Sequence, residues 1–271
     1  MTDTEPEKKK LSVSQYKQYE RCPYSWYLSR VKKVWQRPAA WLGQGSAVHE
    51  AAEAWERSGR QMSVEQAQDV FRESYAKHIN AACEVTPNFE WWFRSGPYAG
   101  EEDIVRRYKI GLEQVEKYIR WYEFHPEEVI WISEDGTPGI EIGFDIELYG
   151  VLIRGFIDAV IAVDNALGVG KTLIVRDNKT GNHPGDDFQL AVYKVALAEQ
   201  YGLDAPAGDY WMGRSGKPTY PFDLTGWTRE RVAEKFHELE ANIAAERFEP
   251  KPDPDKCKFC DVALACEYRA N

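Results

Sequence analysis

The chain has 271 residues, of which 43% are apolar and 29% charged, and its formal net charge is −10. This composition is ordinary for a globular protein and argues against a surface that is basic all over, while leaving room for a local basic groove. No run approaches the roughly 18 apolar residues needed to span a bilayer, and the opening MTDTEPEKKK lacks the apolar segment of a signal peptide. We therefore expect a cytoplasmic protein without a membrane partner, in which the five cysteines are reduced and free to bind a metal.

The first half of the chain has helical patterns after a charged segment, residues 1–10, that we expect to be flexible. Ser12 and Gln15 have the spacing of a capping box, and Pro23 should end that first helix just before it and begin a second one. Residues 43–46, with two glycines, predict a turn. Further helices are predicted over 47–56, 63–81 and 101–124, with a loop or lid over 83–100.

From residue 129 onward the pattern becomes extended. Strands are predicted at 129–133, 140–148, 151–163 and 172–179, with turns at 135–136, 149–150 and 165–170. They are followed by a helix over 187–201, short strands near 209–213 and 217–223, and a last helix over 229–247. This order of helices, a mostly antiparallel sheet and helices again predicts a single α+β domain over residues 11–271.

Three of the five cysteines follow a proline-rich run, in the spacing Cys257-x2-Cys260-x5-Cys266. Two cysteines separated by two residues can reach the same metal, and four thiolates usually hold zinc or an iron–sulfur cluster. The fourth must come from a distant part of the chain, and we favour Cys22, at a helix break, over Cys83, which we assign to packing. Buried, reduced thiols would be a poor explanation for three cysteines so close together. The spacing does not separate zinc from iron–sulfur, and either centre would join the two ends of the chain.

A single acid, Asp158, lies in an otherwise apolar predicted strand. A lone carboxylate there is unfavourable unless it is paired or bound to a metal. The next strand ends in Asp177-Asn178-Lys179, where the acid and the lysine point to the same side. Antiparallel pairing would place Asp158 beside Asp177, and two converging carboxylates make a site for Mg²⁺ or Mn²⁺. A solvated surface pair would explain either motif alone, but it explains both together less well.

The order of these motifs resembles the PD-(D/E)XK nuclease superfamily and, within it, the RecB-like exonucleases that carry an iron–sulfur cluster. That group includes CRISPR-associated and phage-encoded exonucleases and the AddB nuclease domain. The matching residues, in chain order, are Cys22-Pro23, His49 after the glycine-rich Gly45-Ser46-Ala47-Val48, Gly155-Phe156-Ile157-Asp158, Asp177-Asn178-Lys179, Gln189 with Tyr193, and the three C-terminal cysteines. One departure is Asp177, where many members of the family have glutamate. Together the motifs cover nearly the whole chain.

The resemblance implies a restriction-endonuclease-like core with a central mixed sheet flanked by helices. It also implies that the N- and C-termini meet at a metal cluster, in which residues 250–271 contribute Cys257, Cys260 and Cys266 and the fourth ligand is Cys22. The cofactor there would be a 4Fe-4S cluster, with zinc as the alternative.

The resemblance also assigns roles at the acidic site. His49, Asp158 and Asp177 would ligate a catalytic Mg²⁺ or Mn²⁺ ion, with the carbonyl of Asn178 as a further ligand. Lys179 would orient the attacking water or stabilise negative charge on the phosphorus.

Other residues would contact the DNA itself. The resemblance implies that Gln189 and Tyr193, one helical turn apart, face one groove and hold the DNA backbone. Trp91, Trp92 and Arg94, in the predicted loop, could stack on single-stranded bases, although a plain hydrophobic lid explains them at least as well.

We therefore expect a metal-dependent deoxyribonuclease, an exonuclease that hydrolyses phosphodiester bonds at DNA ends and could have endonuclease activity as well. Its partners would be DNA, single-stranded or with free ends, and proteins of phage or bacterial recombination, repair or CRISPR adaptation. Two alternatives stay open: a non-catalytic module of the same fold that recognises DNA ends in a larger complex, and a zinc-stabilised protein-interaction domain. The set of Asp158, Asp177 and Lys179 favours the enzyme, because a binding module would not need all three.

Overall fold

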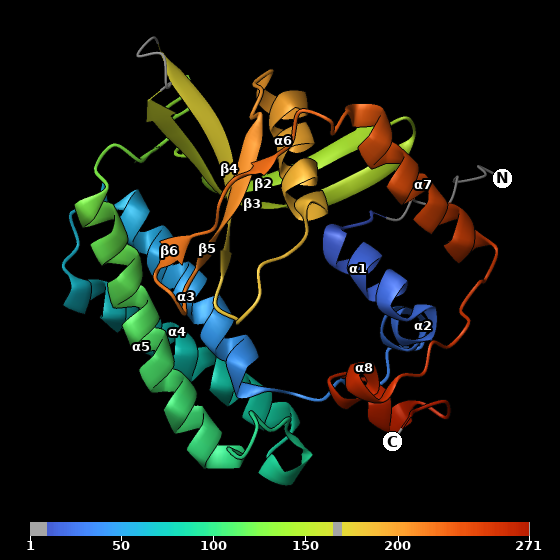
Figure 1. Ribbon diagram of the computed structural model, residues 1–271. Helices are drawn as coiled ribbons and strands as arrows, with labels where there is room; N and C mark the ends of the chain where they lie inside the picture. The colour runs from blue at the N-terminus through green and yellow to red at the C-terminus, as the bar shows by residue number, and fades with distance from the viewer. Residues whose placement is uncertain (1–9, 165–169, 271) are drawn as a thin grey trace, which may run out of the picture.

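The computed structural model describes residues 10–164 and 170–270 (Figure 1). Most of the flexible segment predicted at 1–10, and of the turn predicted at 165–170, lies outside the described residues. Helices cover both faces of a central sheet, so the α+β architecture predicted from the sequence is found.

Two short helices begin the described chain: α1 (Val13–Arg21) and α2 (Pro23–Arg30). The Ser12 hydroxyl accepts a hydrogen bond from the Gln15 amide at 3.3 Å and caps α1, but the Gln15 side chain donates to another carbonyl and leaves the capping box open. Between the helices, Cys22 has an extended backbone and Pro23 occupies the first turn of α2, as predicted.

Three longer helices form a layer on one face of the sheet (Figure 1): α3 (Ala40–Arg57), α4 (Val64–Val85) and α5 (Gly100–Phe124). The capping box of Ser63 and Gln66 opens α4 as predicted. The turn predicted at 43–46 is wrong, because these residues lie inside α3. A Cβ atom on Gly43 would lie 3.2 Å from a side chain of α4, so this glycine allows two helices to pack closely rather than forming a turn.

The described strands of the sheet are β1 (Val129–Ile130), β2 (Ile140–Leu148), β3 (Val151–Asp164), β4 (Lys171–Lys179), β5 (Ala207–Met212), β6 (Lys217–Pro218) and β7 (Phe222–Asp223). The long strand β3 pairs antiparallel with β1, β2 and β4. Strand β5 lies parallel to β4, after the crossover helix α6 (Asp187–Tyr201), and pairs antiparallel with β6 and β7. The sheet is therefore mixed, as the resemblance implies, and β1 is shorter than the predicted strand at 129–133.

Each face of the sheet has its own apolar core. Helices α1, α2, α6 and α7 (Arg229–Ala244) pack on one face, and α3, α4 and α5 pack on the other. Strands β2 and β3 take part in both cores: Ile142 and Ile157 belong to the first, whereas Ile140 and Ala159, two positions away, belong to the second. A regular strand would keep such residues on one face. Along β2, the side chains change from one face of the sheet to the other at Glu141, whose φ of 47° is left-handed. Along β3, the same change occurs at Asp158, which lies opposite Glu141.

The C-terminal segment returns to the first two helices through α8 (Pro254–Lys258) and η2 (Ala263–Ala265) (Figure 1). The amide of Lys251 lies 3.5 Å from the Cys22 sulfur, and the Tyr24 hydroxyl donates to Glu267 at 3.1 Å. Segments from the two ends of the described chain therefore lie side by side.

A buried arginine ties β4 to β5. Arg176 donates to both carboxylate oxygens of its register partner Asp209, at 2.6 and 2.7 Å, and to Glu128 at 2.6 Å. Because a buried charge without its partner is strongly unfavourable, this pair holds the parallel register at the end of β4 that carries Asp177.

We expect Asp209→Ala to lower the free energy of unfolding by about 3–5 kcal/mol, since it leaves Arg176 buried without its main partner. Asp204→Ala removes the surface partner of Lys194 and is the control, with an expected loss under about 1 kcal/mol. Urea unfolding followed by circular dichroism measures both. Equal losses in the two variants would contradict a dominant role for the buried pair.

Candidate active site

Asp158 and Asp177 lie side by side on neighbouring strands. The register of β3 and β4 pairs Ala159 with Arg176 and so places the two aspartates opposite each other. Both are buried, at 7% and 2% exposure, and the Tyr193 hydroxyl of α6 lies 3.1 Å from an oxygen of each. The antiparallel pairing predicted from the sequence is therefore found.

Burial makes this pair of carboxylates electrostatically unfavourable. It raises the pKa of both, and the neighbouring charge of Asp158 adds to the effect on Asp177, whose pKa reaches about 6. Three groups oppose this rise: the imidazole of His49, the ammonium of Lys179, and the amide of Asn178, which donates to Asp158 at 2.9 Å. Lys179 forms an ion pair with Asp177, as expected of two residues on the same side of β4.

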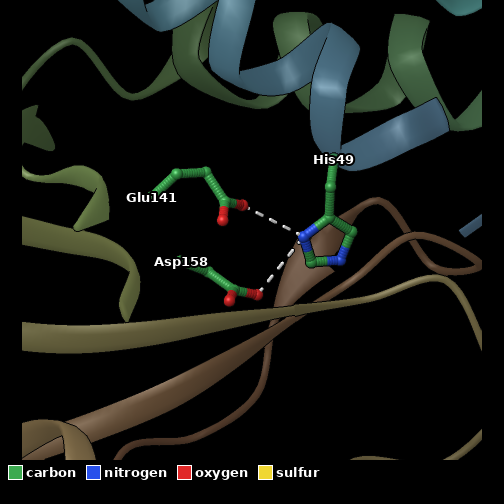
Figure 2. A group of neighbouring side chains, drawn as sticks. All are labelled: His49, Glu141 and Asp158. Carbon is green, nitrogen blue, oxygen red and sulfur yellow. Dashed lines mark hydrogen bonds and ion pairs between the residues drawn. The ribbon is translucent and has the colours of Figure 1, made fainter. Parts of the chain in front are cut away.

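His49 reaches the carboxylates from helix α3. One turn earlier, a Cβ atom on Gly45 would lie 3.3 Å from the threonine that follows β4, so a glycine lets α3 approach the strand closely. The Nδ1 atom of His49 lies 3.3 Å from Oε1 of Glu141 and 3.5 Å from Oδ2 of Asp158 (Figure 2). Its Nε2 atom lies 2.9 Å from the Asn178 carbonyl oxygen. Burial disfavours the imidazolium, but the nearby carboxylates outweigh it and raise the pKa of His49 to about 9.

Glu141 also lies at this site, next to His49 and Asp158, although no sequence motif indicated it. It lies beside Asp158 because β2 and β3 are joined by the two-residue turn Tyr149-Gly150, predicted from the sequence. The turn pairs Leu148 with Val151, and counting back along the hairpin places Glu141 opposite Asp158. That count was the signal in the sequence that could have found it.

Comparison with known proteins identifies the family of the chain. A family model described as the PD-(D/E)XK nuclease superfamily matches residues 10–267. The chain belongs to the PD-(D/E)XK nuclease superfamily. Among the described residues of this nuclease, no helix is long and apolar enough to cross a bilayer.

Two similar proteins are both called Gene 69 protein. The one from Mycobacterium phage D29 is 55% identical, over 94% of this chain and 95% of its own. The one from Mycobacterium phage L5 is 53% identical, over 98% and 99%. A solved structure of a candidate exonuclease from Eubacterium rectale is 13% identical over 97% of this chain and 90% of its own, and its TM-score of 0.44 is too low to support an argument about function.

PD-(D/E)XK nucleases use divalent metals, and one group of side chains here fits such an ion. One ligand atom each from His49, Glu141 and Asp158 lies within 4.8 Å of the other two. Carboxylate oxygens and an imidazole nitrogen are suitable ligands for Mn²⁺ or Mg²⁺, and a cation would offset the buried negative charge. Of the four ligands expected from the sequence, this group contains His49 and Asp158, while Asp177 and the Asn178 carbonyl lie next to it.

Tyr193 lies against the two aspartates. It is buried, and its hydroxyl faces Asp158 and Asp177 rather than the surface. The hydroxyl has one proton, which it can share in hydrogen bonds to the two carboxylates, and its contact with the DNA backbone stays a prediction. Gln189, one turn earlier on α6 and half-buried, stays a predicted DNA contact.

The four cysteines predicted to bind a metal line one small cavity. Cys22, Cys257, Cys260 and Cys266 all border it, and its volume is about 30 Å³. Burial raises the pKa of Cys260 and of Cys266, and the charges of Cys22 and Cys257 add to the effect on Cys266. Cys83 lies apart on α4, where it packs against the helical core, as expected.

We expect Mn²⁺ to bind at His49, Glu141 and Asp158 and to raise the melting temperature, because it binds the folded chain and offsets buried charge. Glu141→Gln should weaken Mn²⁺ binding at least about tenfold in isothermal titration calorimetry, since it removes one charged ligand. Glu147→Gln changes an exposed acid on the same strand and is the control. Wild-type affinity in Glu141→Gln would exclude this residue from the metal site.

Proposed function

We propose that this PD-(D/E)XK nuclease is a divalent-metal-dependent deoxyribonuclease that hydrolyses phosphodiester bonds at DNA ends. The observation that supports it most is the meeting of Asp158, Asp177 and Lys179 with His49 and Glu141 at the end of β4. Two adjacent buried carboxylates destabilise a fold. A module that only binds DNA would gain nothing from these carboxylates, whereas metal-dependent phosphodiester hydrolysis uses them.

The acidic residues would have separate tasks. His49, Glu141 and Asp158 would hold a Mg²⁺ or Mn²⁺ ion, which when bound neutralises phosphate charge and lowers the pKa of a bound water. Asp177 would complete the acidic side of the site and hold Lys179 in place through their ion pair.

Lys179 would act on the reacting groups directly. Its side chain is partly exposed, and its ammonium lies 5.5 Å from the centroid of the Tyr210 ring, beside Asp177. An ammonium held in this way can donate a hydrogen bond to the attacking water or to a phosphate oxygen and stabilise the charge that develops on the phosphorus. Tyr193 would keep both carboxylates oriented, because its hydroxyl can donate a hydrogen bond shared between them.

The preference for DNA ends and the biological setting rest on similarity. The order of the motifs resembles RecB-like exonucleases, and two relatives more than half identical come from mycobacteriophages. We infer a role in phage recombination or repair on DNA that is single-stranded or has free ends, with CRISPR adaptation as a second setting.

We expect the wild-type chain to degrade end-labelled DNA with Mg²⁺ or Mn²⁺ and to lose this activity when a chelator is added. Asp177→Asn and Lys179→Gln should each lower the rate about 100-fold or more, since each removes a group that orients or stabilises the transition state. Lys171→Gln, in a surface pair with Asp164 at the other end of β4, is the matched control. Wild-type rates in both site variants would place the chemistry elsewhere.

Linear and covalently closed circular DNA, compared in the same assay, test the preference for ends. An exonuclease degrades the linear form and leaves the circle intact, whereas nicking of the circle reveals endonuclease activity. Tight binding to DNA ends without any hydrolysis would favour the alternative, a module that recognises ends within a larger complex.

We also propose that Cys22, Cys257, Cys260 and Cys266 hold a 4Fe-4S cluster, with zinc as the alternative. Two observations support a metal there: the four residues line the same cavity, and the amide of Lys251 lies 3.5 Å from the Cys22 sulfur, like the donors that tune cluster thiolates. Such a centre would fasten the C-terminal segment to α1 and α2.

We expect protein purified without oxygen to be brown, with a broad visible absorption band and about four iron atoms per chain. Cys266→Ser should lower both the iron content and the melting temperature, because it removes one ligand. Cys83→Ser, outside the cavity, should retain both. A colourless protein with about one zinc per chain would select the alternative, and a protein with neither metal would refute the proposed centre.

A further inference from the structure

Two tryptophans outside the acidic site lie together at the surface. Trp91, in η1 (Phe89–Trp91), is 52% exposed, and Trp35, in the segment between α2 and α3, is 37% exposed. Their rings meet edge to face, with centroids 6.2 Å apart. Trp92, for which the sequence suggested a stacking role, is instead buried and donates its indole N–H to the Thr86 carbonyl at 2.8 Å.

The two rings border a groove of about 410 Å³. Its apolar lining is completed by Val85, the last residue of α4, by Pro87 two residues later, and by Leu264 from the C-terminal segment. Val85 and Leu264 are exposed as well. Contiguous apolar surface of this kind commonly marks a binding site.

One arginine contacts the loop that carries Trp91, and two others lie near that arginine. Arg37 donates its Nε–H to the Trp91 carbonyl at 2.9 Å and so fixes the loop that carries Trp91. Burial lowers the pKa of Arg37, and the positive charges of the exposed Arg269 and Arg94 add to this effect. The groove itself is lined by uncharged residues, so these arginines lie outside it and are the nearby cations to which an anionic ligand could bind.

We propose that Trp35 and Trp91 form a stacking platform for unpaired bases of single-stranded DNA, with Arg94 and Arg269 contacting its phosphates. This inference rests on the proposed deoxyribonuclease function and specifies the form of DNA that the site receives. Aromatic rings beside cations bind single strands, since every base has a face that can stack and the backbone is anionic. In a duplex the base faces are covered by neighbouring pairs, so the platform discriminates against double-stranded DNA.

Helix α3 connects the platform to the acidic site. The segment that carries Trp35 enters α3 at Ala40, and His49 lies about 14 Å further along the helix axis at 1.5 Å per residue. In Figure 1 this segment runs from α2 to α3 past α8, and the Arg37 amide donates to the Asp261 carbonyl at 2.8 Å. A short segment and one helix therefore join the platform to the acidic site.

The test measures DNA binding with cleavage disabled, so that it does not depend on the nuclease assay. In the full chain carrying Asp177→Asn, fluorescence anisotropy gives the affinity for a labelled oligothymidylate and for a blunt duplex. Adding Trp91→Ala should weaken oligothymidylate binding about tenfold, the loss of one stacked base, and duplex binding much less. Trp91→Phe should keep most of the affinity, because its ring still stacks, while the quenching of tryptophan fluorescence by the oligothymidylate decreases.

Two further variants complete the test. Arg94→Gln should make the affinity for oligothymidylate less dependent on salt. The slope of log affinity against log salt concentration should fall by the contribution of about one phosphate contact. Phe124→Ala removes a ring that is 78% exposed at the end of α5 and should bind both DNA forms as the parent does. Thermal unfolding of each variant verifies that the chain is folded.

The proposal is overturned if Trp91→Ala binds oligothymidylate as the parent does, or if Phe124→Ala loses as much affinity. Equal losses for single-stranded and duplex DNA would also overturn it, as would a change in oligomeric state without a change in DNA affinity, which would assign the groove to a protein contact. Because cleavage is disabled throughout, a wild-type chain that fails to degrade DNA would refute the proposed function without altering this binding result.

Discussion

The site depends on one electrostatic constraint: two carboxylates, Asp158 and Asp177, are buried next to each other on adjacent strands. Water does not solvate them, so burial raises the pKa of both, and other parts of the chain must compensate. Tyr193 from α6, Lys179 from β4 and His49 from α3 do so from three different elements. The contacts that stabilise the acids therefore also fix how the helices on both faces approach the sheet.

The same constraint explains why a divalent cation suits this protein. His49 has a pKa of about 9 because carboxylates surround it, and the field that favours its protonation would also attract Mg²⁺ or Mn²⁺. Without a cation, that field would repel a DNA phosphate, as would a net charge of −10. The metal centre and the proposed platform near Arg94 and Arg269 are two places where an acidic protein could accept an anionic polymer.

Local signals in the sequence were sufficient for many of the elements and for one contact within the site. The strand over 140–148 and the helix over 187–201 have the bounds that were predicted. Turn residues and side-chain alternation mark such boundaries locally, since both act over a few positions. Antiparallel pairing predicted that Asp158 and Asp177 lie next to each other. The two-residue turn before β3 also sets the register of the hairpin, which places Glu141 opposite Asp158.

Only the tertiary structure decided which side chains these elements turn toward the site. Packing of α3 against α4 keeps residues 43–46 helical, although their glycines predicted a turn. Trp92 is buried in the core whereas Trp91 is exposed, and the Tyr193 hydroxyl faces Asp158 and Asp177. At Glu141 the strand passes from one core to the other, which alternation with a period of two does not predict. The sequence by itself determined the bounds of elements such as β2 and α6, because the signals that set them are local. Contacts between distant segments determined the composition of the site.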